Sequence, residues 1–123
     1  MGLLRTPLAT AAAVATMDLY KQEELFERSS ELAPYFEEAV HSLKDMPHVI
    51  DVRNLGLMCG VELAPVADHP GRRAYQCFLE CYDKGVLVRS AGETVALTPP
   101  LIANRQHVDQ IVGTMGEALM AIA

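Results

Sequence analysis

The stretch from Val49 to Leu63 constrains the fold more than any other part of this chain. In its first half, Ile50 and Val52 alternate with charged residues, and its second half alternates again. The apolar members of the second half are Leu57, Cys59, Val61 and Leu63. This period of two predicts two half-buried strands, joined at Gly56, which tolerates a positive φ. Gly60, inside the second strand, predicts a bulge or a close approach of another group to the backbone.

Composition limits the class of protein. The chain has 123 residues, half of them hydrophobic, so we expect one domain with a substantial core. Its net charge of −6 argues against general nucleic-acid binding, and no apolar run reaches membrane-spanning length. Ala13–Ala15 resembles a signal-peptidase site, but the apolar pattern continues through it as in a helix. Three cysteines without a framework spacing indicate reduced thiols and a cytoplasmic protein.

Helical patterns lie on both sides of this hairpin. Residues 9–20 are Ala-rich and follow Pro7, which suits a first helical turn. Residues 23–45 carry an apolar stripe, and Pro34 should kink or split that helix. The stripe consists of Leu25, Leu32, Phe36, Ala39, Val40 and Leu43. The acids on its other face are most simply a solvated surface.

The second half of the chain predicts two more helices and two short strands. Residues 72–84 form a helix that Gly85 caps, and a last helix follows the N-cap Asn104. The inward positions of the first are Ala74, Phe78, Cys81 and Tyr82, and those of the last are Val108, Ile111, Val112, Met115, Leu119 and Ile122. The strands are residues 86–89 and 94–98. The fold class is therefore α+β, a two-layer α/β sandwich with a small, largely antiparallel sheet of three or four strands covered by helices.

Few residues indicate chemistry by themselves. Cys77 and Cys81 lie one helical turn apart, but no matching pair completes a zinc site, so we interpret them as buried small hydrophobes. The histidines are scattered over predicted surface and loop positions, namely His41, His48, His69 and His107. No nucleophilic triad stands out by order, and the glycines form no phosphate-binding loop. We therefore expect no metal site and no catalytic residue.

Five blocks of sequence, in order, carry a resemblance. They are Pro7–Tyr20, Glu31–Glu38, Val52–Leu63, Lys84–Arg89 and Leu97–Ile102. Together they resemble the C-terminal part of class III pyridoxal-phosphate aminotransferases, with the ω-amino acid–pyruvate (β-alanine–pyruvate) branch most similar. The resemblance implies that residues 1–123 are one domain like the family's small domain. It also implies that residues 8–20 match the helix leading in from the large domain.

The resemblance assigns one binding residue. Arg89 matches an arginine associated with the substrate carboxylate, a role that suits the planar fork of a guanidinium. The alternative interpretation is an arginine at the end of a strand, paired with an acid such as Glu93. The family's Schiff-base lysine, pyridine-nitrogen aspartate and phosphate-binding residues lie in the large domain. Lys21, Lys44 and Lys84 do not sit in that motif's context, so we expect no cofactor on this chain alone and no activity by itself.

Three functional hypotheses follow. The first is a truncated or stand-alone aminotransferase small domain, linked by resemblance to transamination between an ω-amino acid and pyruvate. The second is a homo-oligomeric binding or assembly module that reuses the fold, because a detached small domain leaves apolar surface uncovered. The third is one subunit of a split aminotransferase, whose large-domain partner chain supplies the lysine.

Overall fold

The computed structural model describes residues 6–123, and this part of the chain contains four α-helices, one 3-10 helix and four strands. In chain order they are α1 Pro7–Gln22, α2 Leu25–His41, η2 Ser42–Asp45, β1 Val49–Leu55, β2 Met58–Leu63, α3 Arg72–Asp83, β3 Arg89–Ala91, β4 Thr94–Leu97 and α4 Arg105–Ala121. The strands form one sheet in the order β1-β2-β4-β3, and every neighbouring pair is antiparallel. The predicted α+β class is confirmed.

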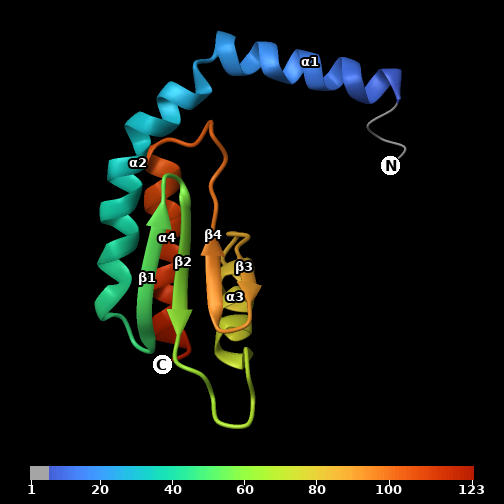
Figure 1. Cartoon of the computed structure of the whole chain (residues 1–123). Helices are drawn as coiled ribbons and strands as arrows, with labels where there is room; N and C mark the ends of the chain where they lie inside the picture. Colours follow the sequence, from blue (N-terminus) through green and yellow to red (C-terminus); the bar gives the residue numbers. More distant parts are fainter. Residues whose placement is uncertain (1–5) are drawn as a thin grey trace.

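One layer of helices covers one face of this sheet. Helices α2, α3 and α4 pack together behind the strands in the view of Figure 1. Their inward side chains meet those of the strands in a core that includes Phe36, Val61, Leu63, Met115 and Leu119, each fully buried. No helix of residues 6–123 covers the opposite face, which we call the open face.

The β1–β2 hairpin forms as its alternation predicts, with one correction. Gly56 has φ +57°, and Val52 and Cys59 are buried. Ile50, expected on the same side as Val52, is 59% exposed. The register shifts between Val49 and Asp51, as at a β-bulge, where two residues oppose one and the alternation slips. The bulge therefore lies in β1, and Gly60 marks a close approach instead.

Helix α2 is not split at Pro34. It runs unbroken from Leu25 to His41, and the chain turns earlier, at Glu24, which adopts a left-handed φ of 50°. Proline removes one N–H, which leaves the carbonyl of Ser30 without its helical partner. Both residues are exposed, so water can satisfy that carbonyl. The predicted stripe is confirmed, with Ala39 only partly buried.

The segment after α3 differs from its prediction. Residues 86–88 were expected to be strand, but ladder pairing begins only at Arg89. The Val86 N–H donates instead to the Cys81 carbonyl of α3, at 2.9 Å, so it is not available to a neighbouring strand. Tyr82, expected to point inward, is 61% exposed, and Cys77 takes the buried position.

The structure confirms both the N-cap and the apolar stripe that were predicted for helix α4. The Asn104 side chain accepts from the His107 N–H, and the His107 ring accepts from the Asn104 N–H, both at 3.1 Å. This reciprocal pair is a capping box, which satisfies two donors that a helix start leaves without partners. The stripe residues are buried or partly buried against the sheet.

Helix α1 stands apart from the rest. Thr6 caps it, Pro7 is its first residue, and none of its side chains is buried. In Figure 1 it projects away from the sheet and touches the body only through the start of α2. Within residues 6–123, no helix has the length and apolarity needed to cross a membrane.

Candidate functional site

The open face of the sheet is the candidate site. Outward side chains of its strands and of Thr98 border a hollow of about 380 Å³. Its lining includes Arg53, Leu55, Met58, Gly60, Ala96 and Thr98. Leu55 and Met58 are 75% and 56% exposed, so apolar area remains in water beside charged groups. Such a mixed surface is typical of a binding site or an interface.

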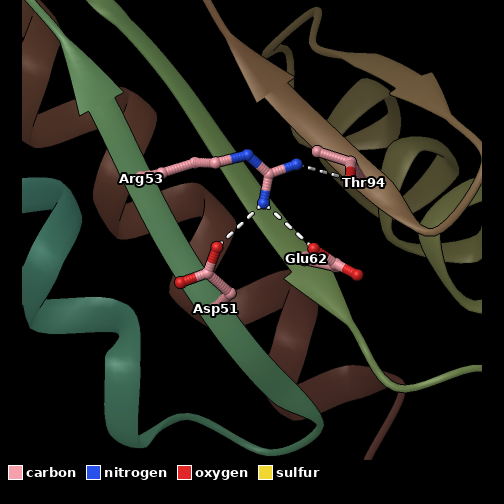
Figure 2. Close-up of polar contacts among 4 residues, drawn as sticks. All are labelled: Asp51, Arg53, Glu62 and Thr94. Atoms are coloured by element: carbon pink, nitrogen blue, oxygen red, sulfur yellow. Dashed lines mark hydrogen bonds and ion pairs between the residues drawn. The ribbon is translucent and has the colours of Figure 1, made fainter.

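Arg53 organises the centre of this face, as Figure 2 shows. Its Nη1 donates to Asp51 Oδ2 at 2.9 Å and to Glu62 Oε2 at 3.0 Å, and its Nη2 donates to Thr94 Oγ1 at 3.4 Å. The side chain thereby links β1, β2 and β4. Hydrogen bonds to the two carboxylates raise the pKa of the Arg53 guanidinium above its usual range, so it stays charged.

Gly60 makes room for this arrangement. A Cβ on Gly60 would lie 3.2 Å from Thr94 Cγ2 and 3.6 Å from Arg53 Nε. Because glycine has no side chain, the Arg53 side chain can lie flat over β2 and reach β4. The predicted close approach at Gly60 is thus provided by an arginine of the neighbouring strand.

Arg89 lies on the same row of the sheet. Arg53 pairs with Gly60, Gly60 with Ala96, and Ala96 with Arg89, so two arginines flank two small residues. Neighbouring strands are about 4.8 Å apart, so the row spans about 14 Å. The Arg89 side chain is exposed, and it has no hydrogen bond or ion pair to any residue in the described part of the chain.

Glu93 does not pair with Arg89, which was the alternative interpretation of that arginine. Its Oε1 accepts from the backbone N–H of Gly71 at 2.6 Å, at the start of α3. The carboxylate is favoured there by the positive end of the helix dipole. Its Oε2 is buried and has no partner within residues 6–123. Glu93 therefore joins the β3–β4 turn to α3 and leaves Arg89 exposed.

The histidines that contact other side chains have structural partners. His41 Nε2 lies 2.7 Å from Asn54 Oδ1, which links α2 to β1, and His107 belongs to the α4 capping box. Among residues 6–123, no three His, Cys, Asp or Glu side chains gather as metal ligands. A separate hollow of about 560 Å³ follows the outer side of α2, away from the open face.

The lysines do not fit the attachment of pyridoxal phosphate. Such attachment needs a lysine facing a cofactor cavity, with an acid for the pyridine nitrogen. Lys21 and Lys44 are exposed on α1 and η2, and Lys84 pairs with Glu117 of α4 at 3.2 Å. None of the three lies on the open face, so we derive no step through this cofactor from these residues.

Sequence reasoning proposed Arg89 as a binding residue, which stays a prediction, and it missed the Arg53 network. The turn at Gly56 fixes a register in which Asp51 faces Glu62 and Arg53 faces Gly60. That register, read together with the charges, was the signal available in the sequence. The bond from Arg53 to Thr94 needed the tertiary neighbour β4, which no local pattern indicates.

Comparisons with known proteins agree with the fold and with the predicted family. The family model described as aminotransferase class III matches residues 4–119. An omega-aminotransferase of Caulobacter vibrioides is 46% identical over 113 residues, which are 92% of this chain and 26% of that protein. A beta-alanine–pyruvate aminotransferase of Pseudomonas aeruginosa is 35% identical over 95% of this chain and 26% of its own length. The omega transaminase of Pseudomonas jessenii in complex with PMP superposes with a TM-score of 0.87 at 29% identity, over 94% of this chain and 27% of that one.

Proposed function

The chain belongs to the class III aminotransferase family, and from this premise we propose that it supplies a carboxylate-binding surface to a transaminase active site. It spans about a quarter of the length of the curated relatives it matches, 26% for the first two. The cofactor-binding groups would come from elsewhere in a longer polypeptide or from a partner chain. Arg89 carries this proposal, because it is an exposed guanidinium on the open face with no acid partner in the described structure.

The proposed reaction of the complete enzyme is transamination between an ω-amino acid and pyruvate. The names of the relatives include β-alanine and pyruvate, and both molecules carry a carboxylate. A guanidinium can bind both oxygens of a carboxylate with two parallel hydrogen bonds. Arg89 would hold that group, while the reacting amine or carbonyl lies toward the cofactor. The buried thiols and the absence of a disulfide among the described cysteines support a cytoplasmic location.

In this proposal residues 1–123 act as the small domain, which α1 joins to a large domain. Helix α1 buries none of its side chains, and Leu8, Val14 and Met17 are each at least 61% exposed. An isolated helix of this length is marginal in water, so a packing partner would stabilise it. The same observation favours one alternative function, a homo-oligomeric binding or assembly module in which α1 contacts a second copy.

A chimera tests the role of Arg89. Residues 7–121 would replace the matching segment of the Caulobacter relative, and the variants Arg89→Ala and Arg89→Lys would be compared with the unmodified chimera. One hydrogen-bonded charge pair is worth about 1.5–3 kcal/mol, so Arg89→Ala should raise the KM for pyruvate about 10- to 100-fold. Arg89→Lys should recover part of that loss, because it keeps the charge but not the fork.

The control is an amine donor without a carboxylate, whose kinetics the Arg89 variants should leave within about twofold. An unchanged KM for pyruvate in Arg89→Ala would contradict the proposal. For the isolated chain, borohydride reduction with pyridoxal phosphate should label no single lysine specifically. Sedimentation of the isolated chain separates the two functions, because concentration-dependent self-association would favour the assembly module.

A further inference from the structure

Three carboxylates on the open face or its margin already have partners. Asp51 and Glu62 accept from the same Nη1 of Arg53, at 2.9 and 3.0 Å. Glu93 accepts from the N–H of Gly71 at 2.6 Å. Arg89 consequently remains without an acid partner, although a sheet with this many acids could readily neutralise it.

Glu62 is the acid that Arg89 could reach most directly across the sheet. Glu62 pairs with Thr94, and Arg89 pairs with Ala96, two residues further along β4. Two strand spacings and two residues along a strand separate their Cα atoms by about 12 Å. Two long side chains on one face can close that gap, because Ala96 between them is small. The ion pair between Glu62 and Arg53 competes with such a pair (Figure 2).

We propose that Arg53 is a positioning residue, which holds Glu62 so that Arg89 stays available for a carboxylate. The link to a carboxylate rests on the proposed function, whereas the effect of Arg53 on Arg89 does not. The flat placement of Arg53 over Gly60 is essential to this role, since it directs one guanidinium to both acids and to Thr94. A lysine has no planar fork and would hold the acids less completely.

The test measures how fast a dicarbonyl reagent, p-hydroxyphenylglyoxal, modifies Arg89 in the full chain. Peptide mass spectrometry gives the rate at that residue. In Arg53→Ala, Glu62 and Arg89 can pair, and the rate should fall about two- to fivefold, as expected for an exposed ion pair worth up to about 1 kcal/mol. In Arg53→Ala with Glu62→Gln, the rate should return to that of the unmodified chain.

Two controls make the result specific. Glu62→Gln alone should leave the rate at Arg89 unchanged, because Glu62 is paired with Arg53 and not with Arg89 in the unmodified chain. Circular dichroism must show the same fold for each variant, and Arg53→Lys, which keeps one charge beside the acids, replaces Arg53→Ala if the latter unfolds. Arg53→Lys should then lower the modification rate at Arg89 less than Arg53→Ala would. Adding Glu62→Gln should again restore that rate. A purely structural role for Arg53 would not be rescued by changing Glu62.

The inference fails if the rate at Arg89 is unchanged in a folded Arg53 variant, or if Glu62→Gln does not restore a lowered rate. These outcomes are distinct from failure of the proposed function. If Arg89→Ala leaves the KM of the chimera unchanged while the labelling behaves as expected, Arg53 still controls Arg89 but no substrate carboxylate binds there. If instead Arg89→Ala raises the KM of the chimera while the labelling rate at Arg89 does not depend on Arg53, the carboxylate site stands and Arg53 has no role in it.

Discussion

At the scale of single residues, Cys59 shows how the two faces of β2 differ. Its thiol points into the core and is 5% exposed, while Met58 and Gly60 on either side belong to the open face. Burial raises the pKa of Cys59 from an ordinary value near 9 to about 11. The thiol is therefore protonated at neutral pH and a poor nucleophile.

This pKa predicts a loss of stability at alkaline pH. Between pH 9 and 11 the unfolded chain loses the Cys59 proton and the folded chain keeps it, so unfolding is favoured as pH rises. The contribution of Cys59 is complete below pH 9 and is lost through pH 11, a change of about 2–3 kcal/mol in the free energy of unfolding. Urea unfolding of the unmodified chain and of Cys59→Val, at pH 8 and pH 11, measures the difference. Parallel pH profiles for the two chains would contradict the prediction.

Which residues lie inside was largely predictable, but their polar partners were not. Cys77 and Cys81 were expected to be buried small hydrophobes, and both are fully buried. Spacing alone did not reveal the partner of Cys77, whose thiol donates to Met115 Sδ of α4 at 3.5 Å. The hydrogen bonds of Glu93 and Arg53 could not be predicted from local sequence either, because they join residues that are 22 and 41 positions apart.

At the scale of elements, boundaries depended on competing hydrogen bonds. The alternation of Val86, Leu87 and Val88 is that of a strand, with the two valines buried and Leu87 exposed. The strand nevertheless starts at Arg89, because α3 takes the Val86 N–H. Arg89 is therefore the first residue of β3 rather than the last residue of an earlier strand. That difference places it in the row with Ala96 and Gly60.

Two glycines in different elements give opposite predictions for substitution by alanine. In β2, Gly60→Ala places a Cβ 3.2 Å from Thr94 and close to Arg53, so it should destabilise the fold by about 1–3 kcal/mol. In α4, Gly113→Ala meets no atom within 4 Å and should stabilise by about 0.5–1 kcal/mol through helix propensity. Chemical denaturation measures both. Gly60→Ala should also change the rate at which p-hydroxyphenylglyoxal modifies Arg89, whereas Gly113→Ala should not. Equal effects of the two substitutions on stability would refute the steric argument.

At the scale of the whole molecule, the helices bury one side of the sheet, and no described helix covers the other side. All the strand residues named as core point toward α2, α3 and α4, whereas the charges and several apolar side chains of the strands point the other way. A two-layer arrangement was predictable from the alternation, because a sheet with one apolar face needs one layer of helices packed against that face. The resemblance assigns residues 8–20, in α1, to the connection with a large domain, and none of the side chains of α1 is buried.

Helix α1 should accordingly be dispensable for the stability of the body. Removing residues 1–22 deletes α1, none of whose side chains is buried, and keeps Leu25, which is 6% exposed. The free energy of unfolding should change by less than about 1 kcal/mol, whereas Phe36→Ala should lower it by about 3–5 kcal/mol. Urea unfolding measures both changes, and Phe36→Ala shows that the assay detects loss of core packing. In the intact chain, amides of α1 should exchange with solvent faster than those of α4, since nothing covers α1. Slow exchange in α1, or a loss above about 2 kcal/mol on truncation, would mean that α1 already packs against this chain or against a second copy. Packing against a second copy would favour the assembly module over the detached small domain.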